Sequence, residues 1–300
     1  RDLIVTGVQT CALPIYTILQ FNKRFIGMTQ ELSLTDWQRK TLPFLKKCRI
    51  PPRSVANVTA VTHHIYRDPA LFDARFDLVK SAFLMTRLTC GSIPCVLIVN
   101  RVTPDVESFC EEEGIRLDVD KSLPGGIRCL SLDCIQNMHR RVDSEYVLGI
   151  HGDGFPLRPG LECFVGSYDY IGAPWGRASW FTNLVFPYPK YCVGNGGFTL
   201  RSKRLCEMAS SCYRRRYRLI PYSYVLIDDV FYCKVLPRFE RECRRSMAYA
   251  PPEVAGRFSF ESNLEYYPQS GEMPLGFHAP HGFARVMKDF GDRVDAQFLC

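Results

Sequence analysis

The chain has 300 residues, of which 46% are apolar and 23% are charged, and it contains 21 glycines and 20 prolines. These proportions are typical of a globular protein and exclude a collagen-like, coiled-coil or wholly disordered chain. Lysine and arginine number 38 against 31 acidic residues, a mild excess that suits a phosphate-rich partner without identifying one. The best candidates for a membrane span, Cys95–Val99 and Tyr146–Ile150, have only the length of strands, so we expect a soluble protein with no transmembrane segment.

The first 16 residues are expected to be a non-native segment. Gly7–Ile15 resembles a peptide that arises when adapter DNA is translated at the ends of assembled environmental sequences. The stretch also lacks the basic-then-apolar order of a signal peptide. We therefore base the fold prediction on residues 17–300 alone.

From about Ser54 onward, β-branched segments alternate with segments whose apolar residues recur at helical spacing. The predicted strands are Val55–Thr62, Val96–Asn100, Ile115–Val119 and Glu145–Ile150. The predicted helices are Phe76–Leu88, a segment from Thr103–Pro104 to Gly114, and a stripe from Leu132 to Val142. Thr103 followed by Pro104 is typical of a helix start, and Gly114 is typical of a helix end.

This alternation predicts an α/β fold with a mostly parallel central sheet flanked by helices. Ligand sites in such folds lie just beyond the carboxyl ends of the strands. Asp153 stands at such an end, in the segment His151-Gly152-Asp153-Gly154. We interpret residues 17–300 as one domain with an elaborated second half, in which a boundary near residue 152 separates two halves by function and not as independently folding units.

Fourteen cysteines suggest a disulfide framework until their spacing is considered. Cys-x-x-Cys pairs are absent from the sequence, which argues against zinc ribbons and thioredoxin-like sites. Several cysteines lie inside apolar segments, where a thiol serves as a small buried hydrophobe. We therefore expect free thiols in a reducing compartment, and a cytoplasmic location.

Two segments carry carboxylates suited to catalysis. Asp153 could bind a divalent cation that also contacts a diphosphate, although Asp-Gly is equally a common turn. Asp228 and Asp229 stand at a predicted helix start, where one could act as a general base and both could simply favour the helix dipole. Consecutive helical residues point about 100 degrees apart, so we expect only one of the two to reach a reaction centre.

A glycine-rich segment, Gly194-Asn195-Gly196-Gly197-Phe198, is neither a dinucleotide fingerprint nor a phosphate-binding loop of the P-loop type. It fits a backbone that passes close to a ligand, with a bulged strand or hairpin as the alternative. His278 is a candidate metal or phosphate contact, or a structural histidine. His63 and His64 are interpreted as structural.

The arginine cluster Arg214–Arg218 invites a nucleic-acid interpretation, but no zinc-finger spacing or RNA-binding signature accompanies it. We interpret the cluster as a solvated helix end and expect no nucleic-acid partner. Steep salt-dependent affinity for DNA or RNA would contradict that expectation.

Six segments, taken together and in order, resemble a family of domains of unknown function that is itself similar to A-type-fold nucleotide-sugar glycosyltransferases. The resemblance covers roughly residues 145–282, and it implies a nucleotide-sugar-binding half at 17–152 and an acceptor-binding, catalytic half at 153–300. The segments are Gly152–Phe155, Tyr168–Trp175, Val193–Ser202, Asp228–Phe231, Arg257–Glu261 and Gly276–His278.

The resemblance implies residue roles at the donor side. A D-x-D motif holds a Mn²⁺ or Mg²⁺ cofactor on the diphosphate in such enzymes, and here its second acid matches Asp153 while His151 occupies the first position. Histidine can ligate Mn²⁺, but the change from an acid leaves open a metal-independent or inactive protein. His278 matches a third metal or phosphate contact.

The resemblance also implies roles at the acceptor side. Asp229 matches the catalytic carboxylate and Asp228 its acidic neighbour. The loop residues Asn195, Gly196, Gly197 and Phe198 match the acceptor-side loop. Trp175 is a candidate wall against a sugar ring, or simply a core tryptophan.

The function that follows is metal-assisted transfer of a sugar from a nucleotide-sugar donor to the hydroxyl of a carbohydrate or other acceptor, by direct displacement with inversion. The alternative is a non-catalytic nucleotide-sugar or glycan-binding module of the same fold, motivated by His151. The enzyme interpretation requires Asp153 and Asp229 to face a common cleft.

Overall fold

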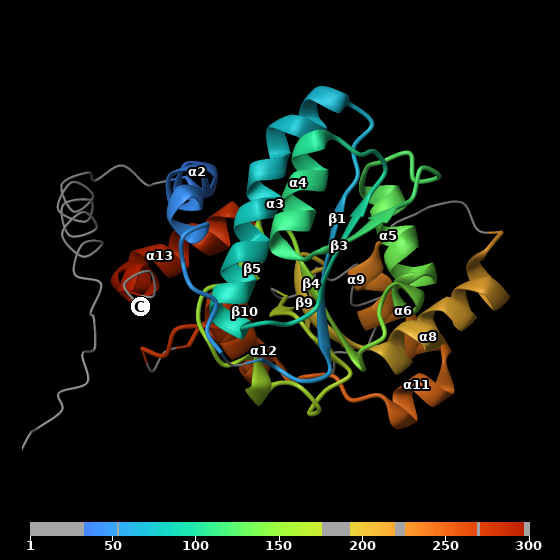
Figure 1. The fold of residues 1–300 in the computed structure, drawn as a ribbon. Coiled ribbons are helices and arrows are strands. Elements are labelled where there is room, and N and C mark those ends of the chain that lie inside the picture. Colours follow the sequence, from blue (N-terminus) through green and yellow to red (C-terminus); the bar gives the residue numbers. More distant parts are fainter. Residues whose placement is uncertain (1–32, 53, 176–192, 220–225, 269–270, 297–300) are drawn as a thin grey trace, which may run out of the picture.

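The computed structural model describes residues 33–52, 54–175, 193–219, 226–268 and 271–296 (Figure 1). The segment 1–16, which we expect to be non-native, lies outside the described residues. All eleven cysteines within the described residues are free thiols.

A six-stranded sheet in the order β3-β2-β1-β4-β9-β6 forms the centre of the protein. Strands β1 to β4 are mutually parallel, β9 pairs antiparallel with β4, and β6 pairs antiparallel with β9, so β9 alone runs against the other five strands of this sheet. The strands are β1 (Val58–His64), β2 (Cys95–Val99), β3 (Arg116–Val119), β4 (Tyr146–Ile150), β6 (Tyr170–Ile171) and β9 (Phe198–Ser202). Every residue of β1, β2 and β9 is buried, as expected of strands covered on both faces. The predicted α/β class with a mostly parallel central sheet is confirmed.

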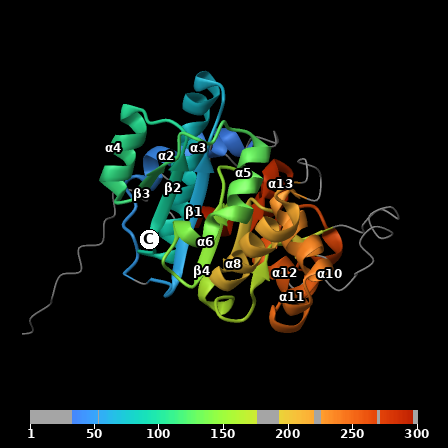
Figure 2. The same cartoon turned by 90° about the vertical axis from the view of Figure 1, so that its right-hand side faces the viewer.

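Helices cover both faces of this sheet (Figures 1 and 2). The connecting helices α3 and α4 lie on one face, and α5, α6 and α8 lie on the other. Their bounds are α3 (Pro69–Cys90), α4 (Pro104–Glu113), α5 (Ile127–Gln136), α6 (Met138–Arg141) and α8 (Lys203–Cys212). The predicted start and end of α4 are confirmed, because the Thr103 side chain accepts from Val106 N and Gly114 adopts a left-handed conformation.

A second, three-stranded sheet lies beyond the carboxyl end of β4. Its order is β10-β11-β5, with β5 (Gly154–Pro156), β10 (Ser259–Phe260) and β11 (Gly276–His278). A two-stranded ribbon pairs β7 (Ala173–Pro174) with β8 (Val193–Gly194). Because β5 follows β4 after a tight turn, this small sheet stands directly at the edge where the sequence places its site.

Helices α2 (Leu34–Leu45) and α13 (Ala279–Ala296) lie side by side at one end of the protein (Figure 1). The Trp37 ring of α2 contacts the rings of Phe155 in β5 and Phe283 in α13, with centroids 6.4 and 5.2 Å apart. Burying these aromatic surfaces fixes α2 and α13 against the small sheet.

The remaining elements follow β9 in the chain, except for the 3₁₀ turn Leu161–Cys163, which lies between β5 and β6. They include two π-helical turns, Tyr213–Tyr217 and Phe231–Val235, which follow α8 and α9. The other elements are α9 (Asp228–Val230), α10 (Leu236–Phe239), α11 (Arg241–Ser246), α12 (Pro252–Phe258) and the 3₁₀ turns Leu161–Cys163 and Leu264–Tyr266. No helix in the described part of the chain is both long and apolar enough to cross a membrane.

Candidate functional site

The turn after β4 carries Asp153. His151 and Gly154 close this turn by two backbone hydrogen bonds, of 2.8 and 3.0 Å. The Gln38 side chain of α2 donates to Gly152 O at 2.6 Å, so a helix from the other end of the chain holds the turn in place. A Cβ on Gly152 would lie 2.9 Å from that of Leu78, which leaves no room for a side chain at this position.

His278 lies beside the same turn. Strands β11 and β5 pair antiparallel with His278 opposite Gly154, and Ala279 N donates to Asp153 O at 2.8 Å. Glu261 binds the Nδ1 atom of His278 at 3.1 Å. Burial alone would lower the pKa of His278, but the Glu261 carboxylate and the nearby Asp153 and Asp229 raise it above its usual value. The three charged groups therefore lie within electrostatic reach of one imidazole.

His151 differs from His278 in the direction of its pKa shift. Burial lowers the pKa of His151 below its usual value, so the ring is neutral at pH 7. A neutral imidazole keeps a lone pair that can accept a hydrogen bond or ligate a metal ion.

The strand order reverses between β1 and β4, which is where open α/β sheets place their ligands. Tyr66 follows β1, and Asp153 follows β4. Burial raises the pKa of Tyr66, the charge of Arg75 opposes the rise, and the charge of Asp153 adds to it.

The glycine-rich segment forms a compact loop before β9. Asn195 has a φ of 73 degrees, and its Oδ1 accepts from the backbone N–H groups of Gly197 and Phe198 at 2.9 and 3.1 Å. Such local bonds allow asparagine to adopt the left-handed conformation that the turn requires. The Tyr170 hydroxyl donates to Asn195 O at 2.9 Å. The buried Nδ2 of Asn195 has no hydrogen-bond partner among the described residues.

This loop makes close contacts on both sides, which explains its glycines. A Cβ on Gly197 would lie 2.1 and 2.2 Å from the Cδ2 and Nε2 atoms of His278. A Cβ on Gly196 would lie 2.8 Å from Oδ2 of Asp228. Only glycine therefore fits between the imidazole on one side and the acidic pair on the other.

Asp229 binds the backbone of this loop. Its Oδ2 accepts from Asn195 N at 3.0 Å, and its Oδ1 accepts from Val230 N at 2.7 Å. Burial, and then the charge of Asp228, raise the pKa of Asp229 to about 6. A carboxylate with a pKa close to neutrality is suited to general base catalysis.

Asp228 occupies a different environment, although it is the next residue. Its Oδ2 accepts from Arg201 Nη2 at 2.7 Å, and its Oδ1 accepts from Ser131 Oγ at 3.4 Å. Both side chains of the Asp228–Arg201 ion pair are almost fully buried, with 3% and 4% of their surface exposed. The two acids thus point differently, as the helical spacing predicts, and Asp228 is engaged in the core.

Two aromatic residues that the sequence places on the acceptor side are packed against the protein. Phe198 is fully buried and stacks on Phe258 with centroids 4.7 Å apart, so its side chain cannot contact an acceptor. The Trp175 ring is half-buried and covers Gly194, where an added Cβ would lie 1.8 Å from ring atoms. Lys234 Nζ lies 5.1 Å from the centre of the Trp175 ring.

No group of three or more His, Cys, Asp and Glu side chains in the described residues is arranged to hold a metal ion. Asp153 and His278 are therefore two candidate ligands rather than a complete set. A Mg²⁺ or Mn²⁺ ion that takes one or two protein ligands and completes its shell with phosphate oxygens is compatible with them. The Glu261 contact also fits, because metal-binding histidines commonly give their other nitrogen to a carboxylate.

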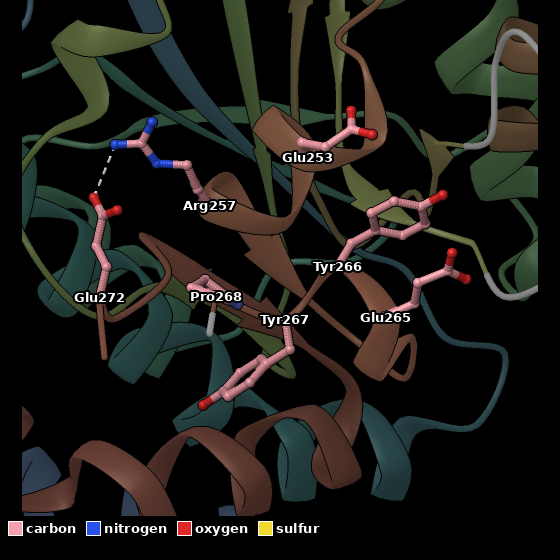
Figure 3. Close-up of a pocket in the computed structure, with 7 residues that line it drawn as sticks. All are labelled: Glu253, Arg257, Glu265, Tyr266, Tyr267, Pro268 and Glu272. Carbon is pink, nitrogen blue, oxygen red and sulfur yellow. Dashed lines mark hydrogen bonds and ion pairs between the residues drawn. The ribbon is translucent and has the colours of Figure 1, made fainter. Parts of the chain in front are cut away.

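Two surface hollows lie near the chain segment that follows Glu261. The first, of about 210 Å³, is lined by glutamates, tyrosines and Arg257, which pairs with Glu272 at 3.0 Å (Figure 3). The second, of about 350 Å³, shares Glu272 and adds Arg158 and Arg293. Neither hollow contains Asp153, Asp229 or His278, so neither is the cleft that the sequence predicts.

Five residues that were assigned no role from the sequence take part in the site. They are Gln38, Tyr66, Tyr170, Arg201 and Glu261. Arg201 lies in a strand whose residues are all buried, and a buried arginine requires an anionic partner. Nothing local to the other four indicates their contacts.

A profile of the family DUF5672, described as "Protein of unknown function (DUF5672)", matches residues 132–278, just under half of the chain. No curated protein matches the chain significantly.

Two solved glycosyltransferases resemble the structure. One is glucosyl-3-phosphoglycerate synthase from Mycobacterium tuberculosis in complex with Mn²⁺ and UDP-glucose, at 13% identity and a TM-score of 0.34. That match covers 55% of this chain, and the chain spans only 60% of the synthase. The other is the mannosyltransferase PcManGT from Pyrobaculum calidifontis in complex with GDP-mannose and Mn²⁺, at 13% identity and a TM-score of 0.38, covering 93% of this chain and 75% of that one. Identities and TM-scores this low do not establish a shared function.

Proposed function

We propose that the protein is a metal-assisted glycosyltransferase that moves a sugar from a nucleotide-sugar donor to a hydroxyl acceptor. The observation that carries the proposal is the contact made by one loop with both halves of the site. Asn195 N binds Asp229, while Gly197 lies against His278, which in turn lies beside Asp153. A candidate base and a candidate diphosphate site therefore adjoin the same short segment of backbone.

In this proposal Asp229 is the general base. The acceptor oxygen attacks the anomeric carbon, and its proton passes to the Asp229 carboxylate. The bond from the anomeric carbon to the diphosphate oxygen breaks, and the nucleoside diphosphate leaves with the electron pair. This single displacement inverts the anomeric configuration. Asp228 acts as a positioning residue, because its ion pair with Arg201 fixes the first turn of α9.

The donor diphosphate is proposed to lie beside Asp153, His151 and His278, with the nucleoside toward Tyr66 at the switch point. A Mn²⁺ or Mg²⁺ ion there would neutralise charge on the diphosphate. The protein's own contribution is orientation, since Glu261 fixes the His278 ring and Gln38 fixes the turn that carries Asp153.

The acceptor is proposed to approach the loop Asn195–Gly197. The unpaired Nδ2 of Asn195 supports this, because a buried donor without a partner costs about 1–3 kcal/mol unless a ligand or water satisfies it. Trp175 remains a candidate wall for a sugar ring on the exposed part of its surface. Phe198 acts by anchoring the loop to the core.

Donor hydrolysis and transfer with a panel of UDP- and GDP-sugars in the presence of Mn²⁺ test the proposal. We expect Asp229→Asn to lower turnover by about two to four orders of magnitude while donor binding persists. Asp143→Asn is the matched control, because Asp143 is an exposed acid just before β4, at the end of that strand remote from Asp153. The proposal fails if correctly folded Asp229→Asn transfers sugar at the parental rate.

A second function is a non-catalytic nucleotide-sugar or glycan-binding module. His151 in the first D-x-D position and the lack of a three-ligand group among the described residues favour it. Calorimetry with UDP and GDP, with and without Mn²⁺, distinguishes the two functions. Metal-dependent binding with slow donor hydrolysis supports the enzyme, and metal-indifferent binding without turnover supports the module.

A further inference from the structure

The excess positive charge of the chain is concentrated in two segments outside the proposed active site. Residues 203–218 and 236–246 contain ten lysines and arginines and three glutamates, an excess of seven. This equals the formal net charge of the whole chain, so the remaining residues are neutral in sum. Such a distribution gives one region of the surface a strong positive potential.

In the first segment, two buried tyrosines flank three arginines that are exposed to solvent. Tyr213 and Tyr217 are buried, and the Tyr217 ring contacts Phe231 edge to face with centroids 5.3 Å apart. Between these anchors, Arg214, Arg215 and Arg216 are all exposed. The charges are thus displayed by a π-helical turn whose aromatic residues are fixed in the core.

The second segment adjoins the first. Glu240, at the start of α11, binds Arg215 Nη2 at 3.4 Å and Arg216 Nε at 3.1 Å. Figures 1 and 2 both show α8, which leads into the π-helical turn, beside α11. We call the exposed arginines of 214–218 and 241–245 the basic face. Five of them form no ion pair with any described residue: Arg214, Arg218, Arg241, Arg244 and Arg245. Arg244 instead donates to the carbonyl oxygens of Pro237 and Arg238.

Two exposed large apolar residues adjoin the basic face in the chain, Leu219 after Arg218 and Phe239 before Glu240. Leu219 is 90% exposed and Phe239 is 49% exposed. A phosphate-rich polymer satisfies arginines but offers a leucine no apolar environment. An anionic bilayer offers both, because headgroups bind the arginines while the acyl boundary accepts the apolar side chains.

We propose that the basic face docks the protein on an anionic lipid bilayer, with Leu219 and Phe239 entering the headgroup boundary. The proposal is independent of the glycosyltransferase function, since it uses none of the residues assigned to that site. It predicts peripheral, salt-sensitive binding, because charges at an exposed surface are screened within about 3 Å at 1 M salt.

Co-sedimentation with vesicles tests the proposal, using phosphatidylcholine with phosphatidylserine against phosphatidylcholine alone. Each basic residue near an anionic surface contributes about fivefold in affinity. We therefore expect the triple variant Arg214→Glu, Arg218→Glu, Arg245→Glu to lose at least about a hundredfold. Leu219→Gln with Phe239→Gln should weaken binding at high salt more than at low salt.

The matched control reverses three exposed basic residues in or just after α2, with the variant Arg39→Glu, Lys46→Glu, Lys47→Glu. It makes the same change in net charge on a helix remote from α11 in both views (Figures 1 and 2). Circular dichroism and the urea midpoint show whether each variant is folded. Binding lost in the basic-face variant and kept in the control supports the proposal.

Three results overturn it. These are equal binding to neutral vesicles, equal loss in the two triple variants, and binding of DNA or RNA without binding of anionic vesicles. If the basic-face variant unfolds, Arg218→Gln with Arg245→Gln is measured in its place, and unchanged vesicle affinity of that double variant also overturns the proposal.

Discussion

Replacing Asp229 with asparagine should stabilise the protein at pH 8 while it lowers sugar transfer by about two to four orders of magnitude. Burial raises the pKa of Asp229 from 3.8 to about 6, so the folded state holds this proton more tightly than the unfolded chain does. Ionising this carboxyl therefore lowers the free energy of unfolding. The loss is absent below pH 3.8, grows between pH 3.8 and about pH 6, and reaches its full size above pH 6. The difference in pKa corresponds to about 3 kcal/mol.

Asparagine removes this charge but disturbs the hydrogen bonds. Asp229 accepts from two backbone N–H groups, and the amide NH₂ of asparagine can accept from neither, so one bond is lost at a cost of about 1 kcal/mol. The expected net gain is about 2 kcal/mol at pH 8. At pH 4 the charge penalty is nearly absent, so the variant should be less stable than the parent by about 1 kcal/mol.

Asp228→Asn is the control, with the same chemical change one residue away. It leaves Arg201 buried without its anionic partner, so we expect a loss of about 3–5 kcal/mol at pH 8. Urea denaturation of both variants and the parent at pH 4 and pH 8 measures these differences. Equal destabilisation by the two substitutions at pH 8 would refute the different roles assigned to the adjacent acids.

Three further predictions concern the site and its support. Sugar transfer should rise tenfold per pH unit up to about pH 6 and then level off, since Asp229 must lose its proton to act; a flat profile from pH 5 to 8 would exclude it as the base. Gly197→Ala should lower turnover at least about tenfold, because the added Cβ displaces the His278 ring; donor hydrolysis rates measure this loss. Gly291→Ala on α13 is the control: its added Cβ would have no neighbouring atom nearer than 3.6 Å, so we expect a gain of about 0.5–1 kcal/mol in the free energy of unfolding, measured from the urea midpoint. Arg141→Met should cost about 3–5 kcal/mol in urea unfolding at pH 7, because Arg141 binds three aspartates at 2.6–3.0 Å; a loss below 1 kcal/mol would contradict this.

Local sequence patterns predicted most of the first half of the fold. β-Branched runs marked β1 and β2, and Thr103 and Gly114 marked the ends of α4, because strands and caps depend on neighbouring residues. Boundaries were less accurate. The predicted stripe from Leu132 to Val142 is two helices, α5 and α6, which are separated at Asn137 by a break that apolar spacing does not encode.

The sequence by itself determined which chemical groups the protein has and which local elements carry them: an acid after β4, adjacent acids at the start of α9, and a glycine-rich segment before β9. Only the tertiary structure decided what these groups do. Asp228 and Asp229 are equivalent in sequence, but Arg201, 27 positions away, neutralises one while burial raises the pKa of the other. The Glu261–His278 contact and the contact of Gly197 with His278 likewise join segments far apart in the chain. The physical reason is that desolvation and ion pairing depend on distance in space, which is set by packing and not by sequence spacing.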